Sequence, residues 1–202
     1  MKSQQDIWSK IAKEWAEFRT QISPAVRDFL KNKKGRILDL GCGSGRNFIK
    51  RKDLKFYCVD FSSEMLRYAR KRADKLEIKA EFIESDSCCL NFPNNYFDSV
   101  ICISLLHCIK GNKRLKIINE LFRVLKPTGQ VFISVWSRNS PRLKNKPKEC
   151  MIPWTMGINK EKRYTYIYEK DELEKEVKKA GFKILKSWEE RNINIIAEKQ
   201  SS

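Results

Sequence analysis

Residues 37–45 begin with an apolar run and end in the pattern D-x-G-x-G-x-G, which is an acidic residue followed by three alternating glycines. Gly41, Gly43 and Gly45 can adopt backbone angles closed to other residues, and they let the main chain approach a ligand closely. Asp39 would lie at the carboxyl end of a strand, where open α/β sheets bind ligands. Because the spacing differs from G-x-G-x-x-G and no phosphate-binding lysine follows, we expect a ligand with a cationic amino group and no pyrophosphate. A tight turn that binds nothing is the alternative.

The net charge is the most unusual global property of the chain. Forty-two Lys and Arg residues stand against 25 Asp and Glu residues, which gives a net charge of +17 and an isoelectric point near 9.6. Such an excess indicates a polyanionic partner, with RNA as the leading candidate. A lysine-rich surface that only keeps the protein in solution is the alternative.

Much of this charge lies in one stretch, residues 138–163, which also carries aromatic side chains. Basic side chains neutralise phosphates, and aromatic faces stack on unpaired bases. The stretch therefore predicts an RNA contact. Its candidate RNA-binding residues are Arg138, Arg142, Lys144, Lys146, Trp154, Arg163 and Tyr164.

Length and cysteine usage limit the remaining classes. The 202 residues suit a single domain. No run reaches the roughly 18 apolar residues of a membrane span, and no signal core follows the first residues, so we expect a cytoplasmic protein without membrane contact. The seven cysteines include no C-x-x-C pair. They predict neither a metal site nor a disulfide framework, and most should be small buried hydrophobic residues.

Strands and helices alternate along the chain. Short apolar runs predict strands at 36–40, 54–60, 80–84, 97–104 and 130–136, as in a parallel sheet covered on both faces. Helices are expected at 4–18, from Ser23-Pro24 onward, and at 45–51, 62–75, 112–125 and 169–180. Two last strands, 182–189 and 192–199, meet across a short turn and add one antiparallel strand.

The expected fold is therefore α/β, with a Rossmann-like, seven-stranded, mostly parallel sheet, one antiparallel strand and helices on both faces. We expect a single domain, 1–202. It consists of N-terminal helices (1–34), a ligand-binding core (35–136), a basic insertion read as a loop near the active site (137–168), and a C-terminal helix with a hairpin (169–202).

This plan, with the glycine motif after the first strand, resembles the class I S-adenosylmethionine-dependent methyltransferases. The resemblance implies S-adenosyl-L-methionine as cofactor, with Asp60 on its ribose hydroxyls, Asp86 on its adenine amino group, and a backbone N–H at Ser87. The implied cofactor-binding residues are Arg19, Asp39, Gly41, Cys42, Gly43, Gly45, Asp60, Phe61, Asp86, Ser87 and Ile103. As alternatives, Asp60 would only cap the next helix and Asp86 would only begin a turn.

Later motifs resemble a narrower family, the tRNA wobble-uridine carboxymethyl methyltransferases. The matching segments are Phe18-Arg19, residues 103–109, residues 123–136, Ile152-Pro153-Trp154 and residues 163–173. The resemblance implies methyl esterification of 5-carboxymethyluridine at the first anticodon position. It also implies a small zinc-binding activator protein as partner.

The chain departs from the pattern of this family at three places. His107-Cys108 stands where two histidines are usual, and Arg163-Tyr164-Thr165-Tyr166 replaces Arg-Tyr-Tyr-His. A base built from paired histidines is thereby excluded, since His107 is the only imidazole in the chain. Pro127-Thr128-Gly129 replaces Pro-Gly-Gly, a change that is harmless if Thr128 needs no positive φ.

The chemistry tolerates the missing histidines, because a carboxylate with a pKa near 4 is already ionised at cytosolic pH. Such an acid has to be positioned, and an arginine can hold it with two parallel hydrogen bonds. Our candidates for catalytic residues are Arg19 and Arg138, whereas Arg163 suits a phosphate. His107 bounds the methyl-transfer pocket or is a hydrogen-bonded structural residue.

Partners and alternative functions complete the expectations. If the third strand lies at the sheet edge, the segment Ala80 to Phe92 offers an open edge with an apolar patch to the activator, which would carry the zinc. The N-terminal helices are the alternative cover for this patch. Two other functions stay open, namely a class I methyltransferase for another RNA base or a small acid, and a catalytically silent RNA-binding subunit of the same fold.

Overall fold

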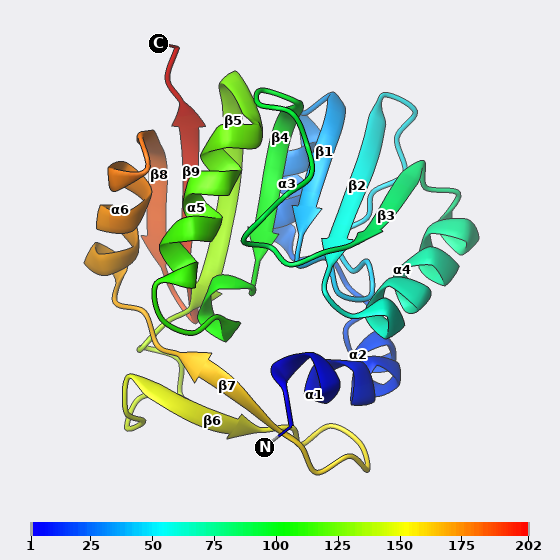
Figure 1. The fold of residues 1–202 in the computed structure, drawn as a ribbon, viewed down its shortest axis with the longest axis vertical. Helices are drawn as coiled ribbons and strands as arrows, with labels where there is room; N and C mark the ends of the chain where they lie inside the picture. Colours follow the sequence, from blue (N-terminus) through cyan, green and yellow to red (C-terminus); the bar gives the residue numbers. More distant parts are fainter. Residues whose placement is uncertain (1, 202) are drawn as a thin grey trace.

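A seven-stranded sheet with the order β3-β2-β1-β4-β5-β9-β8 forms the centre of the molecule (Figure 1). The computed structural model describes residues 2–201. Only β9 runs antiparallel to its neighbours β5 and β8, which confirms the expected fold class. The strands are β1 (Gly35–Leu40), β2 (Leu54–Asp60), β3 (Ala80–Glu84), β4 (Phe97–Ile103), β5 (Leu125–Trp136), β8 (Phe182–Glu189) and β9 (Asn192–Lys199).

Helices cover both faces of this sheet. On one face lie α5 (Lys113–Val124) and α6 (Lys170–Lys179), and on the other lie α3 (Pro24–Lys31) and α4 (Ser63–Leu76). Successive residues of a strand point to opposite faces, so Leu38 and Leu40 pack in the α5 layer and Ile37 packs in the α3 layer. The short apolar runs are hydrophobic throughout because both of their faces are buried.

The end of the sheet where the parallel strands finish is covered by the N-terminal helices (Figure 1). The expected single helix over 4–18 is interrupted at Ile11 and forms α1 (Gln4–Lys10) and α2 (Ala12–Phe18). Ser3 caps the first of them with a reciprocal hydrogen bond to Asp6. As predicted, Ser23 caps α3 and Pro24 occupies its first position.

The expected helix at 45–51 does not form. Residues 43–47 make turns and residues 48–50 are irregular. Gly43 and Gly45 have φ of 53° and 74°, outside the right-handed helical region. A Cβ on Gly45 would lie 2.3 Å from the ring of Phe48, which folds back against Phe56. Packing of this ring under the glycine turn replaces the helix.

The basic insertion is also more ordered than the expected loop. It contains a two-stranded antiparallel sheet, β6 (Glu149–Pro153) paired with β7 (Lys162–Tyr166). This small sheet lies beside α1 and below the main sheet in Figure 1. The Tyr164 N–H donates to the side-chain oxygen of Gln4 at 2.9 Å, which links β7 to α1. Long-range pairing of this kind leaves no local signature in the sequence.

Thr128 does need a positive φ, with a value of 62°. The left-handed region is strained for a β-branched residue, so the replacement of glycine in this turn is not harmless. Thr128 lies in β5, close after the end of α5, where the chain reverses.

Membrane helices, metal clusters and cysteines can be described for residues 2–201 as a whole. No helix in this range is long and apolar enough to cross a membrane. The same residues contain no group of three or more His, Cys, Asp or Glu side chains suited to a metal ion. Of the seven cysteines, Cys42, Cys58 and Cys102 are buried, Cys89 is exposed and the others are half-buried. The prediction that most of the cysteines are buried therefore holds for three of the seven.

Candidate active site

A cavity of about 610 Å³ lies between the carboxyl ends of the parallel strands and the N-terminal helices. One part of its wall is the glycine turn after β1, and another is the chain that follows β2, β3 and β4. The α1 and α2 helices close the side opposite the sheet. The predicted cofactor residues that line it are Gly41, Cys42, Gly43, Asp60, Phe61, Asp86, Ser87 and Ile103.

The glycine turn and the end of β2 are locked together by Asp60. One of its carboxylate oxygens accepts the Gly43 N–H at 2.9 Å, and the other accepts the Ser62 N–H at 3.0 Å. Burial raises the pKa of Asp60 to about 6, while these backbone hydrogen bonds oppose the rise. Each oxygen keeps a further lone pair, so Asp60 can still accept two hydroxyl groups of a ligand. The helix cap of α4 is Ser62, not Asp60.

Asp39 and Gly45 do not line the cavity. Asp39 is fully buried beneath the glycine turn and accepts hydrogen bonds from the amide of Asn47 at 3.3 and 3.4 Å. Burial raises its pKa to about 7. Gly45 faces the ring of Phe48. In this structure both residues shape the turn from behind, whereas Gly41 and Gly43 face the cavity.

The opposite part of the cavity lies after β3. Asp86 accepts the Cys88 N–H at 2.9 Å, and Lys113 is 3.5 Å from its other oxygen. The hydrogen bond from Cys88 is the main cause that lowers the pKa of Asp86. Asp86 therefore begins a turn and lines the cavity at once, so the two expectations for it are compatible.

His107 lies outside the cavity lining, in the 3-10 helix η1 (Leu106–Cys108). It is 2% exposed, its Nδ1 accepts the Trp136 N–H at 3.2 Å, and its ring stacks on Trp136 at 4.7 Å. Burial, and next the charge of Arg163, lower its pKa to about 3. The imidazole is neutral and accepts a hydrogen bond from a backbone N–H, so its contacts are those of a structural residue.

Arg138 and Arg19, the two arginines predicted to position an acid, lie in different surroundings. Arg138 donates to Glu169 at 3.2 Å and to the backbone oxygen of Lys146, and it does not line the cavity. Arg19 does not line the cavity either, and its guanidinium lies 5.3 Å from the ring centre of Trp15, which does. Burial and the charge of Arg142 lower its pKa.

A third arginine, Arg46, lines the cavity directly and was not anticipated. Burial and then the charge of Arg19 lower its pKa. Its sequence signal was its position directly after the last glycine of the motif, in a turn that faces the ligand.

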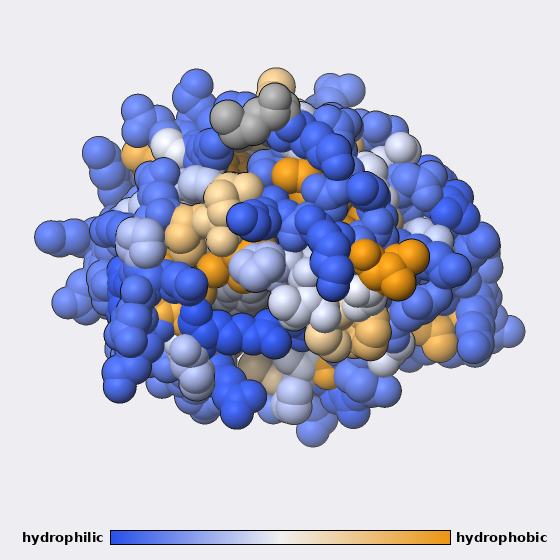
Figure 2. Space-filling model, turned by 90° about the horizontal axis from the view of Figure 1, so that it is seen from below, coloured by the Kyte–Doolittle hydropathy of each residue, from blue (hydrophilic) through white to orange (hydrophobic). Residues whose placement is uncertain are grey.

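The predicted RNA-binding residues divide into two groups. Arg142, Lys144 and Lys146 are exposed, and Arg138 is half-buried. The small sheet β6–β7 lies at the end of the molecule that Figure 2 shows, where the surface is mainly hydrophilic with separate hydrophobic areas. Trp154, Arg163 and Tyr164 are only 3–5% exposed. An RNA contact from an exposed loop does not fit the burial of these three residues. Their pattern in the sequence is the same as that of the exposed group, so only packing tells them apart.

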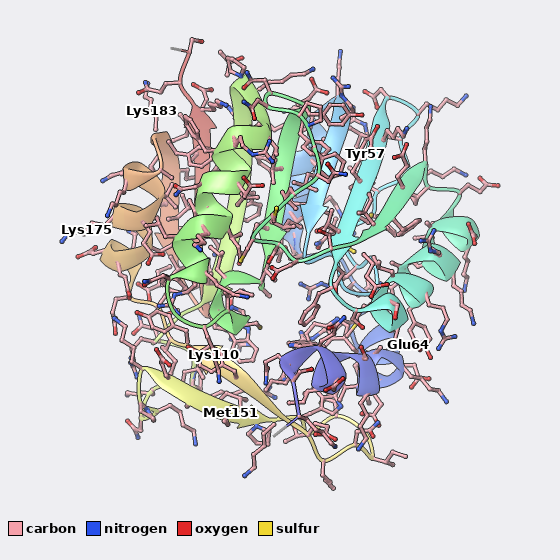
Figure 3. All side chains as sticks on the ribbon, viewed as in Figure 1. Tyr57, Glu64, Lys110, Met151, Lys175 and Lys183 are labelled. Carbon is pink, nitrogen blue, oxygen red and sulfur yellow. The ribbon has the colours of Figure 1, made fainter. Side chains whose placement is uncertain are left out.

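Other cavity residues lacked any recognisable motif. They come from the N-terminal helices and from the chain after β4 (Figure 3), where Lys110 lies 5.2 Å from the ring centre of Tyr164. Helical periodicity alone assigns the aromatic members to a hydrophobic face. Among the missed lining residues of these two segments are Gln4, Gln5, Trp8, Trp15, Lys110 and Lys113.

Comparisons with known proteins agree with this geometry. Residues 37–129, which contain the glycine turn, Asp60 and Asp86, match the family model of a methyltransferase domain. Residues 37–129 therefore form a methyltransferase domain. S-adenosyl-L-methionine is the cofactor of this domain type. The chain is 26% identical over 96% of its length, and 94% of the relative, to the tRNA (carboxymethyluridine(34)-5-O)-methyltransferase of Schizosaccharomyces pombe.

A second relative of the methyltransferase is a Bos taurus protein named "Probable tRNA methyltransferase 9B". Identity is 26% over 76% of the chain, which spans only about a third (33%) of that relative's length. Among solved structures, one from the complex between the Haloferax volcanii Trm112 methyltransferase activator and a methyltransferase is similar at a TM-score of 0.74. It shares 17% identity over 98% of this chain and 96% of its own. At that identity the likeness concerns the fold.

The residues of the methyltransferase cavity fit this cofactor. Gly41 and Gly43 leave the backbone at the end of β1 free of side chains. A Cβ on Gly43 would point at the indole of Trp15, 3.4 Å from its nitrogen. Asp60 is held by two backbone N–H groups with lone pairs to spare. Asp86 lies across the cavity after β3. These groups are suited to a ribose and an adenine amino group, as the resemblance implied.

Proposed function

We propose that this chain methyl-esterifies the carboxylate of a 5-carboxymethyl-type uridine at the wobble position of tRNA. One observation carries the proposal: the only histidine of the chain is buried and neutral outside the cavity. The charged residues that line the cavity are the cations Arg46, Lys110 and Lys113 and the acids Asp60, Glu84 and Asp86. A cavity that contains cations and offers no imidazole favours an acceptor that is already an anion and needs no base.

The chemistry follows from the state of the acceptor. A carboxylate with a pKa near 4 is ionised at neutral pH, so no residue has to remove a proton. When bound, S-adenosyl-L-methionine supplies a methyl group on a positively charged sulfur. The protein contributes alignment, for which roughly 7 to 11 kcal/mol of barrier reduction is available. Trp8 and Trp15, which line the cavity on the side of the N-terminal helices, keep water away from the reacting carboxylate.

We assign the cofactor contacts to residues that line the cavity. Asp60 accepts the ribose hydroxyls, and Asp86 with the Ser87 N–H meets the adenine. The glycine turn leaves room for the amino acid part, and Arg46 beside the turn pairs with its carboxylate. Asp39 supports the turn from beneath.

Two features support tRNA as the substrate. The net charge of +17 favours a polyanion, and the insertion adds the exposed basic residues Arg142, Lys144 and Lys146. The name of the Schizosaccharomyces pombe relative specifies carboxymethyluridine at position 34. That relative matches nearly the whole chain, the basic insertion included.

An activator protein belongs to the same proposal. β3 is the edge strand of the sheet, and α1 and α2 contact α4 and β7 instead of covering it. The expected apolar patch after β3 is smaller than the sequence suggested, because Leu90 is buried and Phe92 packs on Tyr57 and Phe97. We therefore propose pairing at the open strand edge as the main contact of a zinc-binding activator. The similarity to a methyltransferase from a Trm112 complex supports this partner.

One assay tests the proposal. The chain is incubated with labelled S-adenosyl-L-methionine and tRNA that bears 5-carboxymethyluridine, with and without a zinc-binding activator. We expect uptake of methyl as an ester that mild alkali releases, and a higher rate with the activator. Methyl that resists mild alkali would point to another RNA base. Absence of cofactor binding by chain and activator together would point to a silent RNA-binding subunit.

A further inference from the structure

Four of the five tryptophans of the chain gather around one buried arginine. The guanidinium carbon of Arg163, on β7, lies 5.2 Å from the ring centres of Trp8 and Trp154. It lies 5.7 Å from that of Trp136 and 5.9 Å from that of Trp15. All four distances are within the range of cation–π attraction. We call Trp8, Trp15, Trp136 and Trp154 the tryptophan cage. Its members come from α1, α2, the end of β5 and the chain after β6.

The cation in the cage lacks a negative partner. Arg163 is 5% exposed, it makes no ion pair within residues 2–201, and its Nε is buried without a hydrogen-bond acceptor. Aromatic faces attract a cation, but they do not replace acceptors for its five N–H groups. Burial of a charged group is costly unless the group is paired and hydrogen-bonded. An anion from outside the chain would complete this site.

The acids next to the cage are committed to other groups. Glu161, two residues before Arg163, binds both Lys2 and Lys10 at 2.7 Å. Glu14 accepts the Trp154 indole N–H at 2.5 Å and the backbone N–H groups of Ile158 and Asn159 at 2.9 and 3.1 Å. The fold thus places two carboxylates beside the cage and turns both away from Arg163.

The tryptophan cage and the cofactor cavity share a wall. Trp8 and Trp15 belong to both, and Cys108 also lines the cavity, whereas Arg163 itself lies behind this wall and is not among the lining residues. Arg46 lies at another point of the cavity, beside the glycine turn. Two separate cationic positions suit two separate carboxylates, one on the amino acid part of the cofactor and one on the acceptor.

We propose that Arg163, held in the tryptophan cage, binds the carboxylate of the acceptor and positions it for methyl transfer. The inference rests on the proposed function for the identity of the acceptor. It replaces the roles expected from the sequence, because Arg138 is bonded to Glu169 away from the cavity and Arg163 is too buried for a tRNA phosphate at the surface. The planar guanidinium suits a carboxylate with two parallel hydrogen bonds.

The test compares two anticodon stem-loop RNAs that differ only in the wobble side chain, 5-carboxymethyl or the neutral 5-carbamoylmethyl. Binding is measured with the demethylated cofactor present, so that phosphate contacts cancel in the ratio of the two affinities. For the unmodified chain we expect the acid to bind on the order of 10-fold or more tightly than the amide. Arg163→Gln should bring this ratio close to one. Arg163→Lys should give an intermediate ratio, because it keeps the charge and loses the planar fork.

Controls separate this role from a structural one. Lys162→Gln removes an exposed charge from the neighbouring position of β7 and should leave the ratio unchanged. Cofactor affinity should be the same in both Arg163 variants, which shows that the cavity is intact. If Arg163→Gln does not fold, Arg163→Lys decides. A wild-type ratio in the variant that folds, equal weakening of acid and amide, or an unmodified chain without preference would each overturn the inference.

The same experiments distinguish a failure of the proposed function from a failure of the inference about Arg163. An unmodified chain that prefers the acid but transfers no methyl would contradict the proposed function and leave the role of Arg163 standing. A chain that forms the ester equally well with and without Arg163 would contradict only the inference.

Discussion

Asp60 holds the fold together at the glycine turn and, in the proposed function, also binds the ribose of the cofactor. Its two oxygens hold the Gly43 and Ser62 N–H groups, and this fixes the glycine turn next to the end of β2. Burial of the same carboxyl group raises its pKa to about 6. Without a ligand the charged form is disfavoured, and ribose hydroxyls would supply the missing hydrogen bonds. Cofactor binding and the charge state of Asp60 should therefore be linked.

The linkage predicts a pH dependence with two opposite signs. In the free protein the raised pKa of Asp60 means that its contribution to stability is fully present below about pH 4 and is lost as the pH rises through 6. Cofactor affinity should show the reverse, falling by at most about 10-fold per pH unit below pH 6, because a protonated carboxyl group cannot accept both hydroxyls. Calorimetric titration and thermal unfolding between pH 5 and 8 measure the two effects.

The variant Asp60→Asn is the control for this prediction. It cannot ionise, so the pH profile of cofactor affinity should flatten, the cofactor should bind more weakly at every pH, and the stability profile should lose the step at about pH 6. Asp39, whose pKa is raised to about 7 by burial, is the other titrating acid near the turn. Asp39 should give its own step in the stability profile of Asp60→Asn, whereas a step in cofactor affinity that persists in this variant would contradict the assignment of Asp60 to the ribose.

At the scale of elements, the N-terminal helices and the insertion form one structure over the cavity. Glu14 on α2 holds Trp154 and the 158–159 backbone, Gln4 on α1 holds β7, and Lys2 and Lys10 hold Glu161. Every one of these links joins segments about 140 or more residues apart in the chain. The tryptophan cage lies inside this structure, so its geometry depends on these polar links.

Glu14→Gln should loosen the insertion. An amide cannot accept with both of its polar atoms, so the Trp154 indole N–H or the 158–159 N–H groups lose their acceptor. We expect several-fold faster proteolytic cleavage within 154–162, followed by mass spectrometry, and a weaker preference for the acidic stem-loop. Glu17→Gln, an exposed position of the same helix, is the matched control. Equal cleavage rates in the two variants would show that Glu14 does not hold the insertion.

At the scale of the whole molecule, RNA binding depends on where the positive charges lie on the surface as well as on their number. Exposed basic residues occur on many elements, among them Arg142, Lys144 and Lys146 in the insertion and Lys175, Lys178 and Lys179 on α6. Figure 1 shows α6 on the flank of the sheet, away from the N-terminal helices that border the cavity. Of these two groups, we propose that the one in the insertion contacts an RNA whose modified base enters the cavity.

Salt dependence distinguishes these two groups. Replacing Arg142, Lys144 and Lys146 by Gln should reduce the slope of log affinity against log salt for tRNA by about 2 to 3, at roughly 0.7 to 0.9 for each phosphate that is no longer neutralised. Replacing Lys175, Lys178 and Lys179 removes the same charge from α6 and should change the slope little. Filter binding at several salt concentrations measures both. Equal reductions would mean that RNA contacts the molecule through its overall charge.

Local sequence features predicted a large part of this protein. Positive φ at the glycines, the N-cap at Ser23 and the apolar strands each depend on a few neighbouring residues. The antiparallel strand followed from the short turn between 182–189 and 192–199, and the place of the third strand at the sheet edge followed from the resemblance to a known fold. The failures have a tertiary origin. The helix at 45–51 is replaced by packing of Phe48, and β6 and β7 form by pairing with each other across an intervening loop.

By itself the sequence determined the cofactor half of the site, because the glycine turn, Asp60 and Asp86 follow three strands whose carboxyl ends must meet at one edge of a parallel sheet. Only the tertiary structure decided the acceptor half. Arg163 stands in a basic stretch like any surface arginine, yet it is buried among four tryptophans from four segments. Burial and the lack of a partner are properties of packing between distant segments, and no local spacing encodes them.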